Sequence, residues 1–336
     1  MSKHTSTLTK IPSLVLGDAS RLPVLKDATI WVDQGDSIKS AVHDMIQDAE
    51  DILWKNLMLG SRQEERFDVD LNATPDELLF ASVRNSCATA EAQQNRVWMI
   101  NRMLKDSRDD RLYDKKAKTW RTPQVHQYRK HQTRFLELLL VLFYMTSVPM
   151  ICGEEITSLK FRGPKRNICL IDRRLGFIAH LQTASGKAKD VLQFLPWPVG
   201  RLLALYLAYI QRFSACLDPE AGTPFPGEYL WQHEARSWTM DSFTNVLSRE
   251  STIRMGFKWS TQEYRDITMS MGRKYFGAQF RGYLLHLDES LTGMNAEEIN
   301  GLPQDCIGTL KSKSNELYKI IASQWHLILG LHSEKP

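Results

Sequence analysis

Residues 135–152 read FLELLLVLFYMTSVPMIC, which is the longest apolar run in the chain. Four polar or helix-breaking residues interrupt the run, namely Glu137, Thr146, Ser147 and Pro149. Its unbroken part, 138–145, has eight residues, whereas a membrane-spanning helix needs about 20 apolar residues. The run therefore predicts a buried helix over 135–146 that ends at Ser147, in a soluble protein with no membrane partner.

Apolar residues on the N-terminal side of this run recur at steps of three to four residues, as they do along one face of a helix. Between residues 36 and 59 they predict an amphipathic helix or a pair of helices, with Asp36 or Ser37 as the N-cap. The same spacing continues to Leu104. Residues 1–26 are polar and carry two prolines, so we expect a flexible arm there and a helical domain over 27–104.

One short region after the apolar run has the composition of strands. Residues 158–162, 167–172 and 175–181 are rich in Ile, Leu, Phe and Cys, and they are separated by turn residues. They predict a small three-stranded antiparallel sheet. A helix is expected to begin near Gly153, because the two glutamates after it suit the positive end of a helix. Further helices are expected at 200–213, 241–248, 261–276 and 317–331. The predicted fold class is mainly α.

The net charge of the chain, +4 from 43 Lys and Arg against 39 Asp and Glu, is too small to indicate a polyanionic partner by itself. The charges are unevenly placed, however. Residues 101–134 contain eleven Lys or Arg and four Asp, a local difference of +7, with Tyr113 and Trp120 among them. Such a stretch can follow a phosphate backbone. A solvated basic linker over 105–134 explains the same composition, and the sequence leaves both interpretations open.

Motifs of common enzymes and metal sites are absent from the sequence. It has no GxxxxGK[ST], GxGxxG, GxSxG or HExxH pattern. Its five cysteines include no CxxC pair, which argues against a zinc ribbon and fits reduced thiols in an intracellular protein. We therefore expect no cofactor and no bound metal.

Five blocks of sequence follow one another between residues 149 and 273. They are PMICGEEI at 149–156, RNI at 166–168, LP, VG and YL within 195–207, YLW at 229–231, and YRDI with GR within 264–273. In this order they resemble the catalytic domain of tyrosine recombinases of the phage-integrase type. The resemblance is closest to the recombinase-like region of fungal Crypton-type transposon proteins and fungal RecQ-helicase-like proteins. It implies a core-binding-like N-terminal domain, a recombinase-like domain over 135–290 and a C-terminal helical extension over 291–336.

The chemistry of that family makes the departures from its pattern informative. A tyrosine hydroxyl attacks a DNA phosphodiester, two arginines neutralise the phosphate in the transition state, and a lysine and a histidine transfer protons. The resemblance places Cys152 at the first arginine and Asp266 at the histidine. The lysine position falls near residues 181–183, where Gln182 stands, and Lys187 or Lys189 could substitute for it only if the loop folds back. A cysteine has no guanidinium donors for phosphate, and a carboxylate repels it. We therefore expect no catalytic residues and no strand cleavage, since losing one transition-state donor costs about 10²–10³ in rate.

Two family positions are retained or remain open. Arg265 matches the second arginine, and His286 falls near the later His or Trp position. The nucleophile stays unassigned among Tyr275, Tyr283 and Tyr318.

Basic residues that remain in the resembled domain are expected to hold DNA. They are Lys160, Arg162, Lys165, Arg166, Arg173, Arg174, Lys187 and Lys189 around the predicted sheet, and Arg265, Arg273, Lys274 and Arg281 after it. Phosphate contacts of this kind position a protein without reading sequence. The expected function is duplex DNA binding without cleavage, in a nuclear protein whose run KKAK at 115–118 is a weak import-like signal.

An alternative function remains open at this stage. In it the chain is a vestigial or accessory interaction protein of a fungal gene cluster or a decayed mobile element, with no direct DNA or enzymatic role. The sequence predicts no oligomeric state.

Overall fold

The computed structural model describes most of the chain. The described residues are 28–61, 90–106, 108–109, 111–148, 151, 153–163, 166–171, 174–182, 188–214, 216–217, 228–233, 236–277 and 313–333. Of these, 65% are helical, and they include a three-stranded antiparallel sheet, so the predicted mainly helical fold class with a small sheet is confirmed. None of the helices in these ranges has the length and apolar character that a membrane crossing requires. The predicted arm at 1–26 lies outside the described residues.

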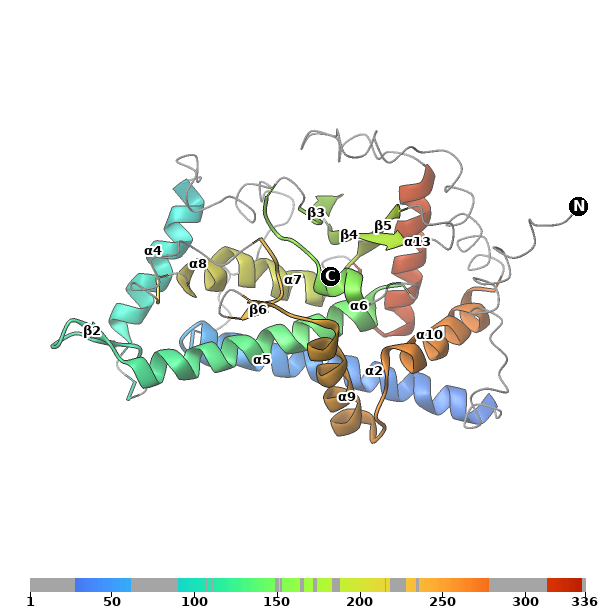
Figure 1. Ribbon diagram of the computed structural model, residues 1–336, viewed down its shortest axis with the longest axis horizontal. Coiled ribbons are helices and arrows are strands. Elements are labelled where there is room, and N and C mark those ends of the chain that lie inside the picture. Colours follow the sequence, from blue (N-terminus) through green and yellow to red (C-terminus); the bar gives the residue numbers. More distant parts are fainter. Residues whose placement is uncertain are drawn as a thin grey trace, which may run out of the picture.

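Helix α5, Thr122–Thr146, runs through the middle of the molecule (Figure 1). The predicted end at Ser147 is confirmed, and the Ser147 hydroxyl donates to the Phe143 carbonyl at 2.5 Å. The predicted start at residue 135 is wrong. The helix begins 13 residues earlier because Pro123 stands in its first turn, where proline favours helix initiation, and the residues that follow contain no helix breaker. The last part of the segment predicted as a basic linker is therefore helical.

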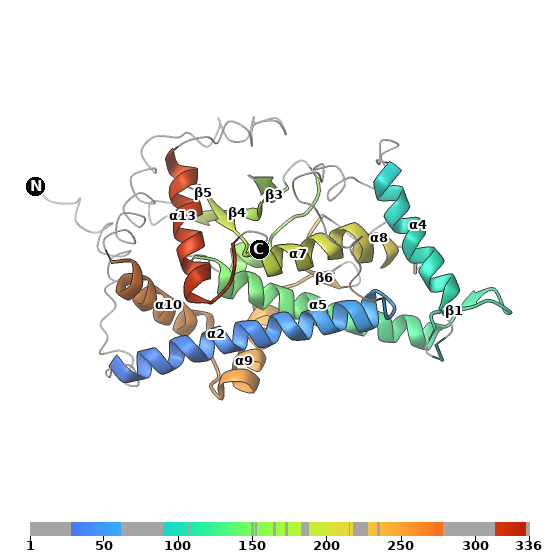
Figure 2. The ribbon, with the colours of Figure 1, turned by 180° about the vertical axis from the view of Figure 1, so that it is seen from behind.

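Helix α2, Ala28–Asp51, continues into a π-helical segment η2, Ile52–Leu57, and lies along α5 (Figure 2). Asp36 and Ser37 do not cap a helix as predicted, because α2 has already begun at Ala28. The buried side chains of α2 belong to the same hydrophobic cluster as those of α5. Whether residues 27–104 form a separate domain stays a prediction, but α2 shares its core with the rest of the molecule.

The sheet has the strand order β3-β4-β5, with β3 Ile168–Ile171, β4 Arg174–Gln182 and β5 Ala188–Phe194. The predicted first strand at 158–162 is wrong, because that segment is not a strand of the sheet: Lys160 forms an isolated bridge with Tyr229, and its carbonyl accepts from the N–H of Ile168 at the start of β3. The Asn167 side chain accepts from the backbone N–H of Lys160 at 3.0 Å and closes the loop between them. The third strand is β5, a segment in which the sequence analysis predicted no strand.

The remaining elements surround α5 and the sheet. They are α4 Ala90–Lys105, β1 Tyr113–Asp114, β2 Thr119–Trp120, α6 Gly153–Thr157, α7 Trp197–Leu205, the π-helical η4 Tyr206–Ile210, α8 Gln211–Ser214, β6 Gln232–His233, β7 Arg236–Ser237, α9 Met240–Met255, α10 Thr261–Phe276 and α13 Lys313–Ile328. All four helices predicted after the sheet are present, with bounds shifted by up to seven residues at one end. The helix predicted near Gly153 is also present, as α6.

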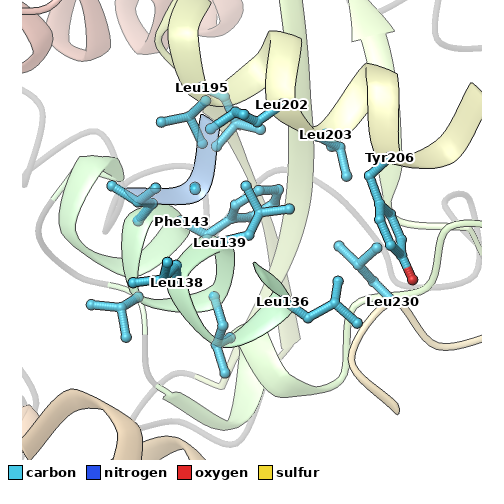
Figure 3. Close-up of a cluster of buried hydrophobic side chains, with 14 of the residues drawn as sticks. Leu136, Leu138, Leu139, Phe143, Leu195, Leu202, Leu203, Tyr206 and Leu230 are labelled. Carbon is cyan, nitrogen blue, oxygen red and sulfur yellow. The ribbon is translucent and has the colours of Figure 1, made fainter. Parts of the chain in front are cut away.

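The core forms between α5, α7 and the sheet (Figure 3). Leu138, Leu139 and Phe143 of α5 lie opposite Leu202 and Leu203 of α7, and all are fully buried. Burying an aliphatic or aromatic side chain of this size contributes about 1.5–3 kcal/mol. These contacts hold α5 in place, and α5 in turn carries the basic residues of its first half.

Candidate nucleic-acid interface

The positions that the resemblance assigns to catalysis are only partly described. Cys152 and His286 lie outside the described residues, and for Gln182 only the backbone at the end of β4 is described. Arg265 and Asp266 are neighbours on α10, where Gln262 donates to the Asp266 carboxylate at 2.9 Å. Burial raises the pKa of Asp266, and the hydrogen bond from Gln262 and the nearby arginines offset only part of this effect.

Two of the three candidate nucleophiles, Tyr275 and Tyr318, are described, and they differ in their exposure to solvent. Tyr275 is half-exposed on α10, with the ammonium of Lys274 5.5 Å from its ring centroid. Tyr318 is buried on α13, and burial raises its pKa to about 12. Desolvation of this kind opposes formation of a phenolate. Tyr283 lies outside the described residues, and the nucleophile stays unassigned.

Two of the described basic residues near the sheet, Lys160 and Arg162, contact other residues of the fold. The Lys160 ammonium donates to Glu228 at 2.8 Å, and this bond raises the pKa of Lys160. Arg162 lies with its guanidinium carbon 4.6 Å from the Phe161 ring, and burial together with the charge of Arg212 lowers its pKa to about 10. These two cations stabilise the loop that leads into β3.

Arg174 links β4 to the C-terminal helix. Its side chain is 7% exposed, and its Nη1 atom donates to the Ser323 hydroxyl of α13 at 2.9 Å. The guanidinium also lies 6.0 Å from the Phe194 ring. A side chain held in this way stabilises the packing of α13 against β4. Contact between Arg174 and DNA stays a prediction.

Helix α10 carries three of the cations predicted to bind DNA, at its middle and C-terminal end. Arg265 and Arg273 are half-buried, and both lie close enough to Asp266 to lower the pKa of its carboxyl. Burial lowers the pKa of Arg273, and the charge of Asp266 partly compensates. Lys274 is exposed. The α10 cations therefore share one local carboxylate.

The remaining predicted DNA-binding residues cannot be placed as a group. Arg166 is half-buried in the loop before β3, and Lys189 is described only by its backbone in β5. Four residues lie outside the described residues: Lys165, Arg173, Lys187 and Arg281.

A second group of cations differs from those near the sheet, because its lysines are exposed to solvent. We call it the basic end; it comprises Lys105, Arg111, the hairpin β1–β2 with Lys115, Lys116 and Lys118, and Lys130 on α5. All five lysines are exposed. The hairpin projects from the end of the molecule opposite α10 and α13 (Figures 1 and 2).

Two carboxylates at or beside the basic end contact neighbouring arginines. Asp106 is buried and accepts from the guanidinium of Arg108 at 3.0 Å. Asp114 accepts from Arg121 at 3.2 Å and from the backbone N–H of Lys116 at 2.9 Å. Hydrogen bonds from the backbone and from the arginine lower the pKa of Asp114, so it stays ionised. The charges of Asp106 and Asp114 are thus each matched by an arginine, and the exposed lysines add positive charge to this end.

The hairpin lysines are not among the residues that the resemblance predicts to hold DNA; they belong to the basic stretch 101–134, for which two interpretations were left open. The local charge of +7 was the available signal, but it could not tell a solvated linker from a structured surface. The structure separates these by showing that residues 113–120 form a paired hairpin and that α5 follows at once.

Comparison of the chain with family models, with curated proteins and with solved structures finds no match. Within the described part of the chain, no three His, Cys, Asp or Glu side chains are grouped as a metal site would require.

Proposed function

We propose that this protein binds duplex DNA through the basic end, as a non-catalytic protein that resembles tyrosine recombinases. The observation that carries the proposal is the contrast between two sets of cations. Those beside the sheet contact Glu228, Ser323 and aromatic rings of the fold, whereas the five lysines of the basic end are exposed. Exposed lysines that neutralise phosphates release counterions from DNA, which gives affinity without sequence readout.

The proposal is tested by fluorescence anisotropy with a labelled 20-base-pair duplex at several salt concentrations. The variant Lys115→Glu/Lys116→Glu is expected to bind about 10- to 100-fold more weakly than the unchanged protein, because two phosphate contacts become repulsive. The matched control is Lys39→Glu/Lys258→Glu, which reverses two exposed lysines of α2 and of the turn after α9. It alters the net charge equally and is expected to keep most of the affinity.

The two variants separate the possible results. Equal losses in both would show a response to net charge alone, and no binding by the unchanged protein at low salt would refute the proposal. In that case the alternative of an interaction protein without a DNA role would be favoured.

Absence of catalysis is the second part of the proposal. It rests on the resemblance, which places Cys152, Gln182 and Asp266 where the family needs cationic or proton-transferring groups. A nicked suicide duplex is expected to form no covalent protein–DNA adduct on a denaturing gel. An adduct that disappears in one of the variants Tyr275→Phe, Tyr283→Phe or Tyr318→Phe would overturn this part and identify the nucleophile.

A further inference from the structure

The carboxylate of the β1–β2 hairpin, Asp114, is held within the turn, and the lysines of the turn are exposed. The Asp114 side chain accepts from the backbone N–H groups of Lys116 and Ala117 at 2.9 and 3.1 Å, and from Arg121 at 3.2 Å. Lys118 has φ 54°, in the left-handed region, which ends the turn and returns the chain to β2. The carboxylate is therefore occupied within the turn, and its charge is matched by an arginine outside the tip.

The side chains at the tip are well suited to contacts with phosphate. Residues 113–120 read YDKKAKTW, with no Arg, Asn or Gln. In the major groove, bidentate readout of guanine uses arginine or lysine, and that of adenine uses asparagine or glutamine. Lysine ammonium groups are flexible point charges that contact phosphate oxygens without a fixed geometry. The tip is therefore suited to positioning DNA through its phosphates.

The aromatic residues of the hairpin do not offer a stacking platform. Tyr113 and Trp120 are directly opposite in the strand register, with ring centroids 5.4 Å apart and planes at 74°. Both are partly buried and pack against the main hydrophobic cluster. Proteins that bind single strands stack successive bases on exposed aromatic faces. In the hairpin, the edge-to-face packing of these two rings holds the two strands together and leaves no such exposed face.

We propose that the hairpin tip contacts the phosphates of B-form duplex DNA, without sequence preference and without stacking on unpaired bases. This inference rests on the proposed function and adds the contact site and the form of the ligand. A two-stranded ribbon is compatible with the wide major groove of B-DNA, whereas the major groove of A-form RNA is deep and narrow. Lys115, Lys116 and Lys118 then contact phosphates along one stretch of backbone.

The experiment measures the salt dependence of binding to a 20-base-pair DNA duplex. Neutralising two lysines in Lys115→Gln/Lys116→Gln is expected to reduce the slope of log affinity against log salt by about 1.8, at about 0.9 per phosphate contact. The control Lys39→Gln/Lys258→Gln is expected to leave the slope unchanged. Three unrelated duplex sequences are expected to bind with affinities within about threefold of one another, a spread smaller than the discrimination that one bidentate base contact supplies.

Two further probes test the form of the ligand: a single-stranded DNA of the same length and an RNA duplex of the same sequence. Both are expected to bind more weakly than the DNA duplex. If the unchanged protein binds DNA but the slope stays the same in the hairpin variant, the inference fails, whereas DNA binding through the other lysines of the basic end, Lys105 and Lys130, survives. Equal or tighter binding to either probe, or a preference above tenfold for one duplex sequence, also overturns the inference. Failure of the unchanged protein to bind any duplex overturns both.

Discussion

His326 is a buried histidine of the C-terminal helix α13. Its side chain is fully buried on α13, and its Nδ1 atom lies 2.7 Å from the Ser333 hydroxyl. Burial, with added repulsion from Arg174, lowers its pKa to about 3 from the ordinary value of 6.5. The imidazole is therefore neutral in the folded protein at neutral pH, and it takes up a proton more easily when the chain unfolds.

The sign of the resulting pH dependence follows from linkage. The stabilisation is fully present above about pH 6.5 and is lost as the pH falls from there towards 3. Between pH 7 and pH 5 the free energy of unfolding of the unchanged protein is expected to fall by about 2 kcal/mol more than that of His326→Asn. Urea unfolding at the two pH values measures this difference. His126→Asn, at an exposed position of α5, serves as the control, and the same fall in both variants would contradict the prediction.

Three helices are joined by a buried ion network around Glu250. The Glu250 carboxylate, 1% exposed on α9, accepts from Arg134 of α5 at 2.5 Å and from Arg249 at 2.9 Å. Arg254 contacts both Glu250, at 3.3 Å, and Asp48 of α2. Burial by itself would raise the pKa of Glu250, but the hydrogen bonds and charges of the two arginines lower it. The network fixes α9 against α5 and α2.

Removing this carboxylate is expected to destabilise the packing of the three helices. Glu250→Gln should lower the free energy of unfolding by about 1–3 kcal/mol, because the arginines lose a buried counter-charge while Glu137 and Asp48 still contact them. Chemical denaturation measures the loss. Glu154→Gln, at an exposed position of α6, is the matched control with an expected change below about 0.5 kcal/mol. A loss below about 1 kcal/mol in Glu250→Gln would show that solvent screens the network.

At the level of elements, sequence patterns predicted the apolar helices well and the sheet in part. The apolar run 135–146 and the segment 261–276 were both predicted as helices, and both are helical. The segment 158–162 has strand composition but pairs with residues 228–230, and the paired residues are 67 to 71 positions apart in the chain. Local composition does not encode that pairing, because partner choice depends on tertiary contacts.

The candidate site was predictable only as a concentration of charge. The count of cations over 101–134 indicated a basic region, but exposure decides which of them are available to a ligand. Arg134 belongs to that segment, yet it is held by Glu250. The resemblance pointed to Arg174, whose engagement by Ser323 no local pattern reveals.

The whole molecule is expected to unfold in one step despite its predicted division into domains. Buried residues of α2 and of the later helices belong to one hydrophobic cluster, and α2 contacts α5, α7 and α9. Far-UV circular dichroism and tryptophan fluorescence should give the same urea midpoint. The variant Trp54→Phe/Trp98→Phe removes the fluorescence of η2 and α4, and its midpoint should again coincide between the two probes. Two separated transitions would show that 27–104 folds on its own.

The π-helical turn at Tyr206–Ile210 determines which change of length this helix can accommodate. A π-turn holds one residue more than an α-turn, so deletion of one residue within η4 would restore ordinary α geometry. Because the wider turn absorbs the extra residue, later residues of the same helix would keep nearly the same orientation after this deletion. Phe213, which packs on Tyr128, and Ser214, which donates to Gln132, would therefore stay close to their partners. A second deletion would find no extra residue to remove, and it would rotate the later residues by about 100°.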